Sequence, residues 1–295
     1  MNGHAWYWLV AGVVAGLVAI ALAGLSAVGA RRWSRVVRPL AERLEAGRRD
    51  QMAWLATVSR FDVREIEGLP APVRRYFQAA LCAGQPIVAA VTFAMAGTFN
   101  QSATGEHWKP FRSRQRVVTR RPGFLWDARI SMLPGLRVRV VDSYVAGSGH
   151  LHAAVAGLVT VADMQGEGDI AQGEFMRYFA ETPWYPTALL PSQGVRWTPV
   201  DERSARATLA DGPLSQTLLF RFNGDGLVDS VRSDARGGLV DGKMVTMPWE
   251  CSMSGYTRRN GMMVPDCGEV AWMRPAGRKS YFRGTLTSMA FEFAP

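Results

Sequence analysis

The longest uncharged apolar run in the chain constrains its fold more than any other feature. Residues 9–30 contain no Asp, Glu, Lys or Arg, and these 22 residues would span about 33 Å as an α-helix. That length matches the roughly 30 Å hydrocarbon core of a bilayer. Aromatic residues lie at both ends of the run, and such residues favour membrane interfaces. The sequence predicts a transmembrane helix over residues 5–30. A cleavable signal is the alternative, although no Lys or Arg precedes the run.

The charges that follow this run predict its orientation and the nature of the next segment. Seven arginines lie within residues 31–49, and positively charged flanks stay in the cytoplasm. The expected location is therefore a bacterial inner membrane crossed once, with the globular domain on the cytoplasmic side and the periplasmic side as the alternative. Residues 31–66 are interpreted as a basic juxtamembrane helical linker, because apolar residues such as Leu40 and Leu44 recur at helical spacing. This linker would lie along anionic headgroups or be solvated.

Two glycines in the apolar run suggest helix pairing. Gly12 and Gly16 form a G-x-x-x-G pattern, and small residues at this spacing let two membrane helices approach closely. The pattern predicts a homodimer through Gly12 and Gly16. Alanine and glycine are common in this chain, so the alternative is that the spacing has no such role.

Charge and cysteine content exclude several functional classes. The net charge is +9, but only three of the 34 basic residues are lysines, a bias that genome composition can produce. No basic block interleaved with aromatics and no nucleic-acid-binding motif is present, so we expect no nucleic-acid partner. The three cysteines fit no zinc-site spacing. The sequence therefore predicts no cofactor.

Alternating patterns dominate the chain after the linker. Arg112, Arg114 and Arg116 occupy one face of a predicted strand, as expected where a strand is half-buried. Turn signals such as Asn260–Gly261 separate similar runs and favour tight hairpins. Roughly ten or more strands at this spacing predict a curled sheet. The predicted fold of residues 67–295 is one α+β, mainly β domain, with an antiparallel half-barrel or barrel-like sheet and a few helices.

A helix predicted over residues 169–181, together with the segment after it, carries the most suggestive side chains. Arg177 and Glu181 are four residues apart and Tyr178 lies three before Glu181, so the three share one helix face. At the mouth of a barrel, charges ringed by aromatics would hold a polar headgroup with apolar tails inside. The alternative is a surface ion pair on a helix packed by its aromatics. The predicted ligand-binding residues are Arg177, Tyr178, Glu181, Trp184 and Tyr185.

Two stretches resemble a known family. Residues 69–77 read Leu-Pro-x-Pro-Val-x-x-Tyr-Phe, and residues 175–191 are rich in aromatics and prolines. With these motifs the chain, from about Leu69 to its C-terminus, resembles a bacterial family known only as a domain of unknown function. That family has no established activity, so the resemblance implies no catalytic residues. The strand-rich layout is also similar to the periplasmic lipoprotein-carrier half-barrels, which bind acyl chains, although fold does not determine function.

Histidines offer a weaker signal. His150 and His152 form a His-x-His on a predicted strand, so both side chains point to one face. Two histidines make an incomplete metal site, and no residue nearby in sequence supplies a third ligand unless Asp142 reaches across the hairpin. The sequence therefore predicts no metal. It also contains no Gly-x-Ser-x-Gly elbow and no phosphate-binding loop.

These observations favour a non-catalytic role: binding a lipid or other hydrophobic ligand close to the membrane. One alternative is a membrane-tethered hydrolase-type enzyme that uses His150, His152 or Glu181. Another is a dimeric interaction scaffold. Whether the domain encloses an apolar cavity is the observation that separates these hypotheses most sharply.

Overall fold

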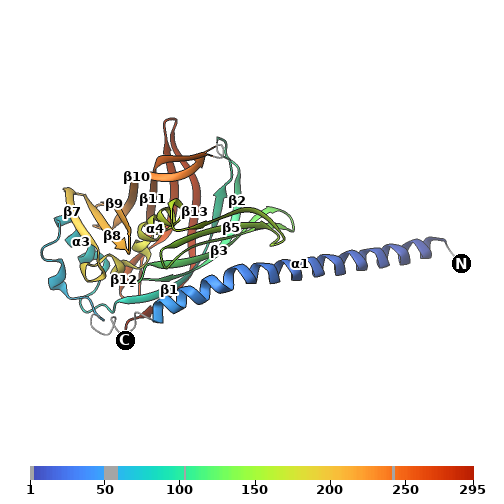
Figure 1. The fold of residues 1–295 in the computed structure, drawn as a ribbon, viewed down its shortest axis with the longest axis horizontal. Helices are drawn as coiled ribbons and strands as arrows, with labels where there is room; N and C mark the ends of the chain where they lie inside the picture. Colours follow the sequence, from blue (N-terminus) through green and yellow to red (C-terminus); the bar gives the residue numbers. More distant parts are fainter. Residues whose placement is uncertain (1–2, 50–58, 103, 241–242) are drawn as a thin grey trace.

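Thirteen antiparallel strands form one continuous sheet in the computed structural model (Figure 1), which describes residues 3–49, 59–102, 104–240 and 243–295. The strands are β1 (Val88–Asn100), β2 (Trp108–Val118), β3 (Gly123–Leu133), β4 (Leu136–Val145), β5 (Ser148–Val155), β6 (Val159–Gly166), β7 (Arg196–Asp201), β8 (Ser204–Asp211), β9 (Leu214–Phe222), β10 (Val228–Val240), β11 (Lys243–Arg259), β12 (Met262–Arg274) and β13 (Gly277–Phe293).

The sheet is two meanders joined at its centre. Strands β1 to β6 run outward to one edge, and β7 to β13 return from the other edge until β13 pairs with β1. Strands β6 and β7 end the sheet, and no strand pairing joins them among the described residues. The predicted mainly β fold with a curled antiparallel sheet is confirmed, in its open, half-barrel form.

Helix α4 (Asp169–Ala180) lies inside this curl. It contacts β3 to β6 from one half of the sheet and β9 and β10 from the other, so this helix bridges the two halves on the concave side. Phe175 and Phe179 on its apolar stripe are fully buried. Three short 3-10 turns then lead to β7, and α3 (Ala71–Ala80) packs near β8 and β12. The turns are η2 (Thr182–Trp184), η3 (Pro186–Leu189) and η4 (Pro191–Gln193), and η1 (Val63–Ile66) precedes α3.

The N-terminal helix α1 (Gly3–Arg49) is continuous, and its first part projects away from the sheet (Figure 1). Its large apolar side chains from Trp6 to Val28 are exposed. By length and composition this is one helix that can cross a membrane. The same test is passed by signal sequences.

The second part of α1 packs on the convex face of the sheet. Trp33, Leu40 and Leu44 are buried there against apolar residues of the strands, including Leu125 and Val141. The stripe that predicted a helical linker is thus covered by the domain rather than left free, because burying it removes apolar surface from water. Residues 50–58 of the predicted linker lie outside the described residues.

Candidate functional site

The charged face of α4 meets the concave side of β4 through one arginine. Arg177 donates from Nη1 to Asp142 Oδ2 at 2.5 Å and from Nε to Glu181 Oε1 at 2.8 Å. Its guanidinium carbon lies 4.9 Å from the ring centroids of both Phe124 and Trp126. The arginine is therefore bound on one side by carboxylates and on another by aromatic faces.

This environment keeps Arg177 charged. Burial by itself would lower its pKa, but the carboxylates of Glu181 and Asp142 outweigh that effect and raise the pKa above its ordinary value. Buried charges persist only when they are paired and hydrogen-bonded in this way. The predicted Arg177–Glu181 pair exists, but it is largely buried, with side chains 15% and 14% exposed, rather than on the surface.

A third carboxyl, Glu174, lies one turn earlier on α4 and is almost fully buried. Burial first, and the nearby charge of Asp142 second, raise the pKa of Glu174 well above its usual range. Glu174 Oε2 and Asp142 Oδ1 both lack a hydrogen-bond donor among the described residues. A proton kept on Glu174 could be donated to Asp142, the carboxylate whose charge raises the pKa of Glu174.

A second arginine reaches the same region through a bulge in β10. Ser233 pairs with Trp249 and Arg236 with Met247, so β10 carries one residue more than β11 across this step. The extra residue turns Arg236 toward the concave side, as bulges commonly do. Its guanidinium carbon lies 4.4 Å from the Trp249 ring centroid, and Arg236 is only 9% exposed. Its Nη1 atom has no hydrogen-bond partner among the described residues.

These groups surround a cavity of about 210 Å³. The charged residues Asp142, Glu174, Arg177, Glu181 and Arg236 form one part of its lining. An apolar cavity of about 150 Å³ is large enough to hold benzene, so this space suits a small apolar group. The rest of the lining is Phe99, Trp126, Val140, Leu151, Trp249, Cys251, Val270, Tyr281 and Phe282.

The structure divides the five predicted ligand-binding residues into two groups. Arg177 and Glu181 line the cavity, whereas Tyr178, Trp184 and Tyr185 are buried and do not line it. Each of these three donates to a backbone carbonyl: Tyr178 to Thr119, Trp184 to Pro265 and Tyr185 to Tyr178, at 3.0, 2.9 and 2.7 Å. They fix α4 and the turns after it from within the core.

Sequence reasoning missed Glu174 and Arg236, and it considered Asp142 only as a possible metal ligand. Asp142 could have been recognised from the sequence as a site residue. It stands between Val140 and Tyr144 on the inward face of β4, where the alternation predicts an apolar residue. Arg236 could not have been recognised in the same way, because only the bulge in β10 turns its side chain toward the concave side.

The residues of the alternative hydrolase site do not come together. His152 pairs with Val141, which faces α1, whereas Glu181 lines the cavity on the concave side. The two histidines therefore lie on the opposite face of the sheet from Glu181. They do approach a third group that the sequence did not suggest, Asp163 on β6.

Gly12 and Gly16 lie in the exposed part of α1. Apart from the adjacent residues and backbone of α1 itself, no atom of the described residues lies within 4 Å of the position that a Cβ would take at either glycine. Their surface is open to a second helix, and helix pairing stays a prediction.

Fold and cavity together define a class of protein: one open, curled antiparallel sheet with helix α4 on its concave side and a partly charged internal cavity. The chain belongs to the family of unknown function DUF6920, whose model matches residues 67–291, and this confirms the resemblance that the motifs predicted. A LolA superfamily protein from Nitrosomonas europaea is similar in structure. It is 12% identical, with 74% of this chain and 93% of that chain covered and a TM-score of 0.38. No curated protein matches the chain.

Proposed function

We propose that the cavity binds the acidic end of a small amphipathic, lipid-like molecule, without catalysis, at the membrane that anchors the chain. The observation that carries this proposal is the Arg236 guanidinium, which is buried beside aromatic walls with Nη1 unpartnered among the described residues. Leaving such a donor without an acceptor is costly, typically about 1–3 kcal/mol and more for a charged group.

An anionic oxygen is the partner that this donor lacks. Carboxylate and phosphate groups accept bidentate hydrogen bonds from guanidinium groups. The neighbouring Arg177 already has two carboxylates, so Arg236 is the group left to receive an acid. The aromatic part of the lining suits the apolar remainder of the ligand. At about 210 Å³ the cavity accommodates one short chain or ring rather than two full acyl chains.

Roles for the sequence-predicted residues follow from their placement. Arg177 and Glu181 belong to the charged part of the lining and orient the headgroup together with Arg236. Tyr178, Trp184 and Tyr185 do not touch the ligand but support the site. Their hydrogen bonds hold α4 and the following turns against the sheet.

The bilayer is the second part of the proposal. It is supported by the exposed apolar first part of α1 and by two hairpin tips beside it. Leu133 near the β3–β4 turn and Val159 near the β5–β6 turn are 64% and 63% exposed. A groove between these hairpins and α1 is lined by Leu22, Leu25 and the arginines Arg129, Arg137 and Arg139, among others. Apolar tips next to arginines suit the boundary between acyl chains and anionic headgroups.

Membrane attachment and its side have direct tests. Alkaline extraction should leave the chain in the membrane pellet if α1 spans the bilayer, and release it if α1 is removed as a signal. The seven arginines after the apolar run favour a cytoplasmic domain. A reporter fused after Pro295 that is active only in the periplasm should therefore stay inactive, and activity would place the domain outside.

The ligand proposal is tested with the full chain held in an amphipol. Native mass spectrometry should reveal a co-purified species, and calorimetric titration should show that octanoate binds more tightly than octan-1-ol. Arg236→Met should weaken octanoate binding at least tenfold. Arg112→Met, on the outward face of β2, should leave it unchanged. Absence of both a bound species and octanoate binding would contradict the proposal.

A further inference from the structure

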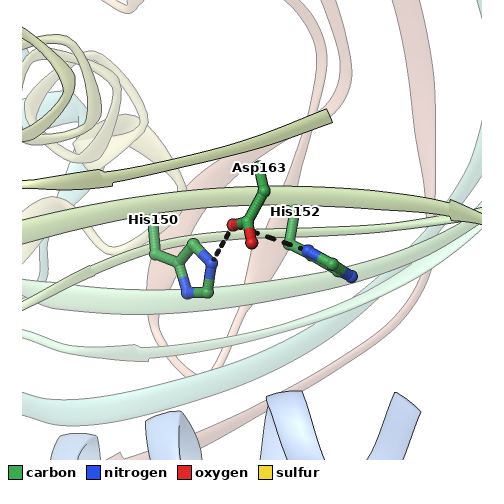
Figure 2. Close-up of side chains that lie close together, drawn as sticks. All are labelled: His150, His152 and Asp163. Carbon is green, nitrogen blue, oxygen red and sulfur yellow. Dashed lines mark hydrogen bonds and ion pairs between the residues drawn. The ribbon is translucent and has the colours of Figure 1, made fainter. Parts of the chain in front are cut away.

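Three metal-ligating side chains converge on the convex face of the sheet near its β6 edge (Figure 2). His150 and His152 project from β5, and Asp163 projects from β6 directly opposite His152. His150 Nε2 lies 2.9 Å from Asp163 Oδ1, and His152 Nδ1 lies 3.5 Å from the same oxygen. The three ligand atoms all lie within 4.8 Å of one another.

The spacing suits a tetrahedral metal. Ligand atoms bound at 2.0–2.1 Å in a tetrahedral arrangement lie roughly 3.3–3.4 Å apart. The two nitrogen-to-oxygen distances, 2.9 and 3.5 Å, fall on either side of that value. The two histidine nitrogens lie within 4.8 Å of each other, so side-chain rotations that bring the three ligand atoms to this common spacing would complete the geometry.

The surroundings hold the ligands in place and leave one side open. The histidine side chains are only 16% and 11% exposed, whereas the Asp163 side chain is 50% exposed. The His152 ring packs on Trp33 of α1, with 5.7 Å between ring centroids. An ion can therefore enter from the Asp163 side and meet two imidazoles whose orientation is already restricted by packing.

Local charge does not oppose a cation. Arg139 contacts the same Trp33 ring as His152 does, but its own charge is paired with a carboxylate. It is 4.7 Å from the Trp33 ring centroid and pairs with Asp127. The ion pairs described for Asp163 are with the two histidines alone. Its charge is thus available to a metal that displaces protons from the imidazoles.

We propose that His150, His152 and Asp163 form a binding site for a divalent transition-metal ion of the zinc class. Two imidazoles and one carboxylate are ligands that zinc accepts, whereas magnesium and calcium prefer oxygen ligands throughout. Three protein ligands leave a fourth position for water. The bound ion would link the edge strand β6 to β5. Because His152 packs on Trp33, it would also stabilise the packing of α1 against the domain.

The test uses the full, untagged chain after chelator treatment, titrated with ZnCl₂ by calorimetry and with CoCl₂ by absorption. One ion should bind per chain, and Co²⁺ should give tetrahedral d–d bands without the charge-transfer band that a thiolate ligand produces. Asp163→Asn and His152→Ala should weaken Zn²⁺ binding at least tenfold. His107→Ala, which removes a histidine from a loop elsewhere, should not change it.

A thermal measurement separates lost binding from lost folding. Zn²⁺ should raise the melting temperature of the wild-type chain and of His107→Ala, because a ligand that binds only the folded state stabilises it. It should not raise that of Asp163→Asn, a variant that keeps the shape of the side chain. Equal Zn²⁺ binding by the wild type and Asp163→Asn, or no binding by the wild type, would overturn the proposal and leave the cluster as a hydrogen-bonded ion pair.

Discussion

The Tyr144 hydroxyl donates a 2.7 Å hydrogen bond to Asp211 Oδ2 and so joins β4 to β8 across the concave side. Eight strands separate β4 from β8 along the sheet. The bond exists because the sheet curls until its two halves face each other. Tyr144 also stacks on Phe175 of α4, with 5.1 Å between ring centroids. This contact helps to set the separation of the two halves that enclose the cavity.

Removing this hydroxyl should weaken the fold measurably. Tyr144→Phe deletes the donor and leaves Asp211 without its partner, so we expect the free energy of unfolding to fall by about 1–2 kcal/mol. Chemical denaturation of the detergent-solubilised chain measures this change. Tyr7→Phe, in the exposed part of α1, is the control and should have no effect. Equal stability of the two variants would show that the bond adds nothing.

Glu174 should make stability depend on pH. Its unfolded pKa is about 4.5 and its folded pKa is well above that, because of burial and the charge of Asp142. Between these two pKa values the folded chain keeps the proton and the unfolded chain releases it. The free energy of unfolding therefore falls as pH rises, by at most about 1.4 kcal/mol per pH unit.

The Glu174→Gln variant tests this dependence. Glutamine cannot ionise, so the variant should gain stability relative to the wild type as the pH rises from about 5 to about 8. Unfolding curves across this interval give the difference directly. Glu167→Gln, at an exposed loop position, should show the same dependence of unfolding free energy on pH as the wild type. A constant difference between wild type and Glu174→Gln would mean that Glu174 is already ionised at the lower pH.

The Arg177 ion pairs should be costly to break. Arg177→Met leaves Asp142 and Glu181 as buried carboxylates without their cation, which typically costs about 3–5 kcal/mol. Arg177→Lys keeps the charge but loses the planar guanidinium that donates to both carboxylates. We therefore expect a smaller loss of stability than in Arg177→Met. The matched surface variant is Arg206→Met, whose partner Asp234 is 3.8 Å away and exposed, with an expected loss of at most about 1 kcal/mol. Similar losses for Arg177→Met and Arg206→Met in denaturation would contradict a buried pair.

Local patterns predicted the strands and turns because their causes are local. Arg112, Arg114 and Arg116 do occupy the outward face of β2, since alternation follows from the pleat alone. Asn260 and Gly261 both have positive φ, 49° and 86°, as a tight hairpin turn requires. The Arg177–Glu181 pair was predictable for the same reason, because both residues lie on one helix.

The rest of the site depends on contacts between distant segments. Asp163 faces His152 because of the register between β5 and β6, which no spacing along the chain reveals. Arg236 reaches the cavity because one residue is inserted in β10. The aromatics Trp184 and Tyr185 looked like ligand contacts in sequence, but packing turns them into the core. Residue type alone could not distinguish these two uses of an aromatic side chain.

The packing of α1 against the domain depends on Gly29. Only a hydrogen atom fits where another residue would carry its Cβ. A Cβ at Gly29 would lie 2.2 Å from the backbone oxygen of Ala156, in the β5–β6 turn, where no flexible side chain can yield. Gly29→Ala should therefore push α1 away from this hairpin and weaken the nearby Trp33 contact, whose indole donates to Asp127 at 3.1 Å. Gly24→Ala is the matched control, because nothing in the described structure lies within 4 Å of its Cβ position.

Hydrogen exchange along α1 distinguishes the two variants. Amides of residues 33–48 should exchange faster in Gly29→Ala than in the wild type, because a helix released from the sheet loses the packing that protects it. In Gly24→Ala they should exchange at the wild-type rate, since that methyl group meets open space and alanine favours the helix. Unchanged protection in Gly29→Ala would mean that α1 holds its place through Leu40 and Leu44 alone. The close approach at Gly29 would then be incidental to docking rather than a requirement for it.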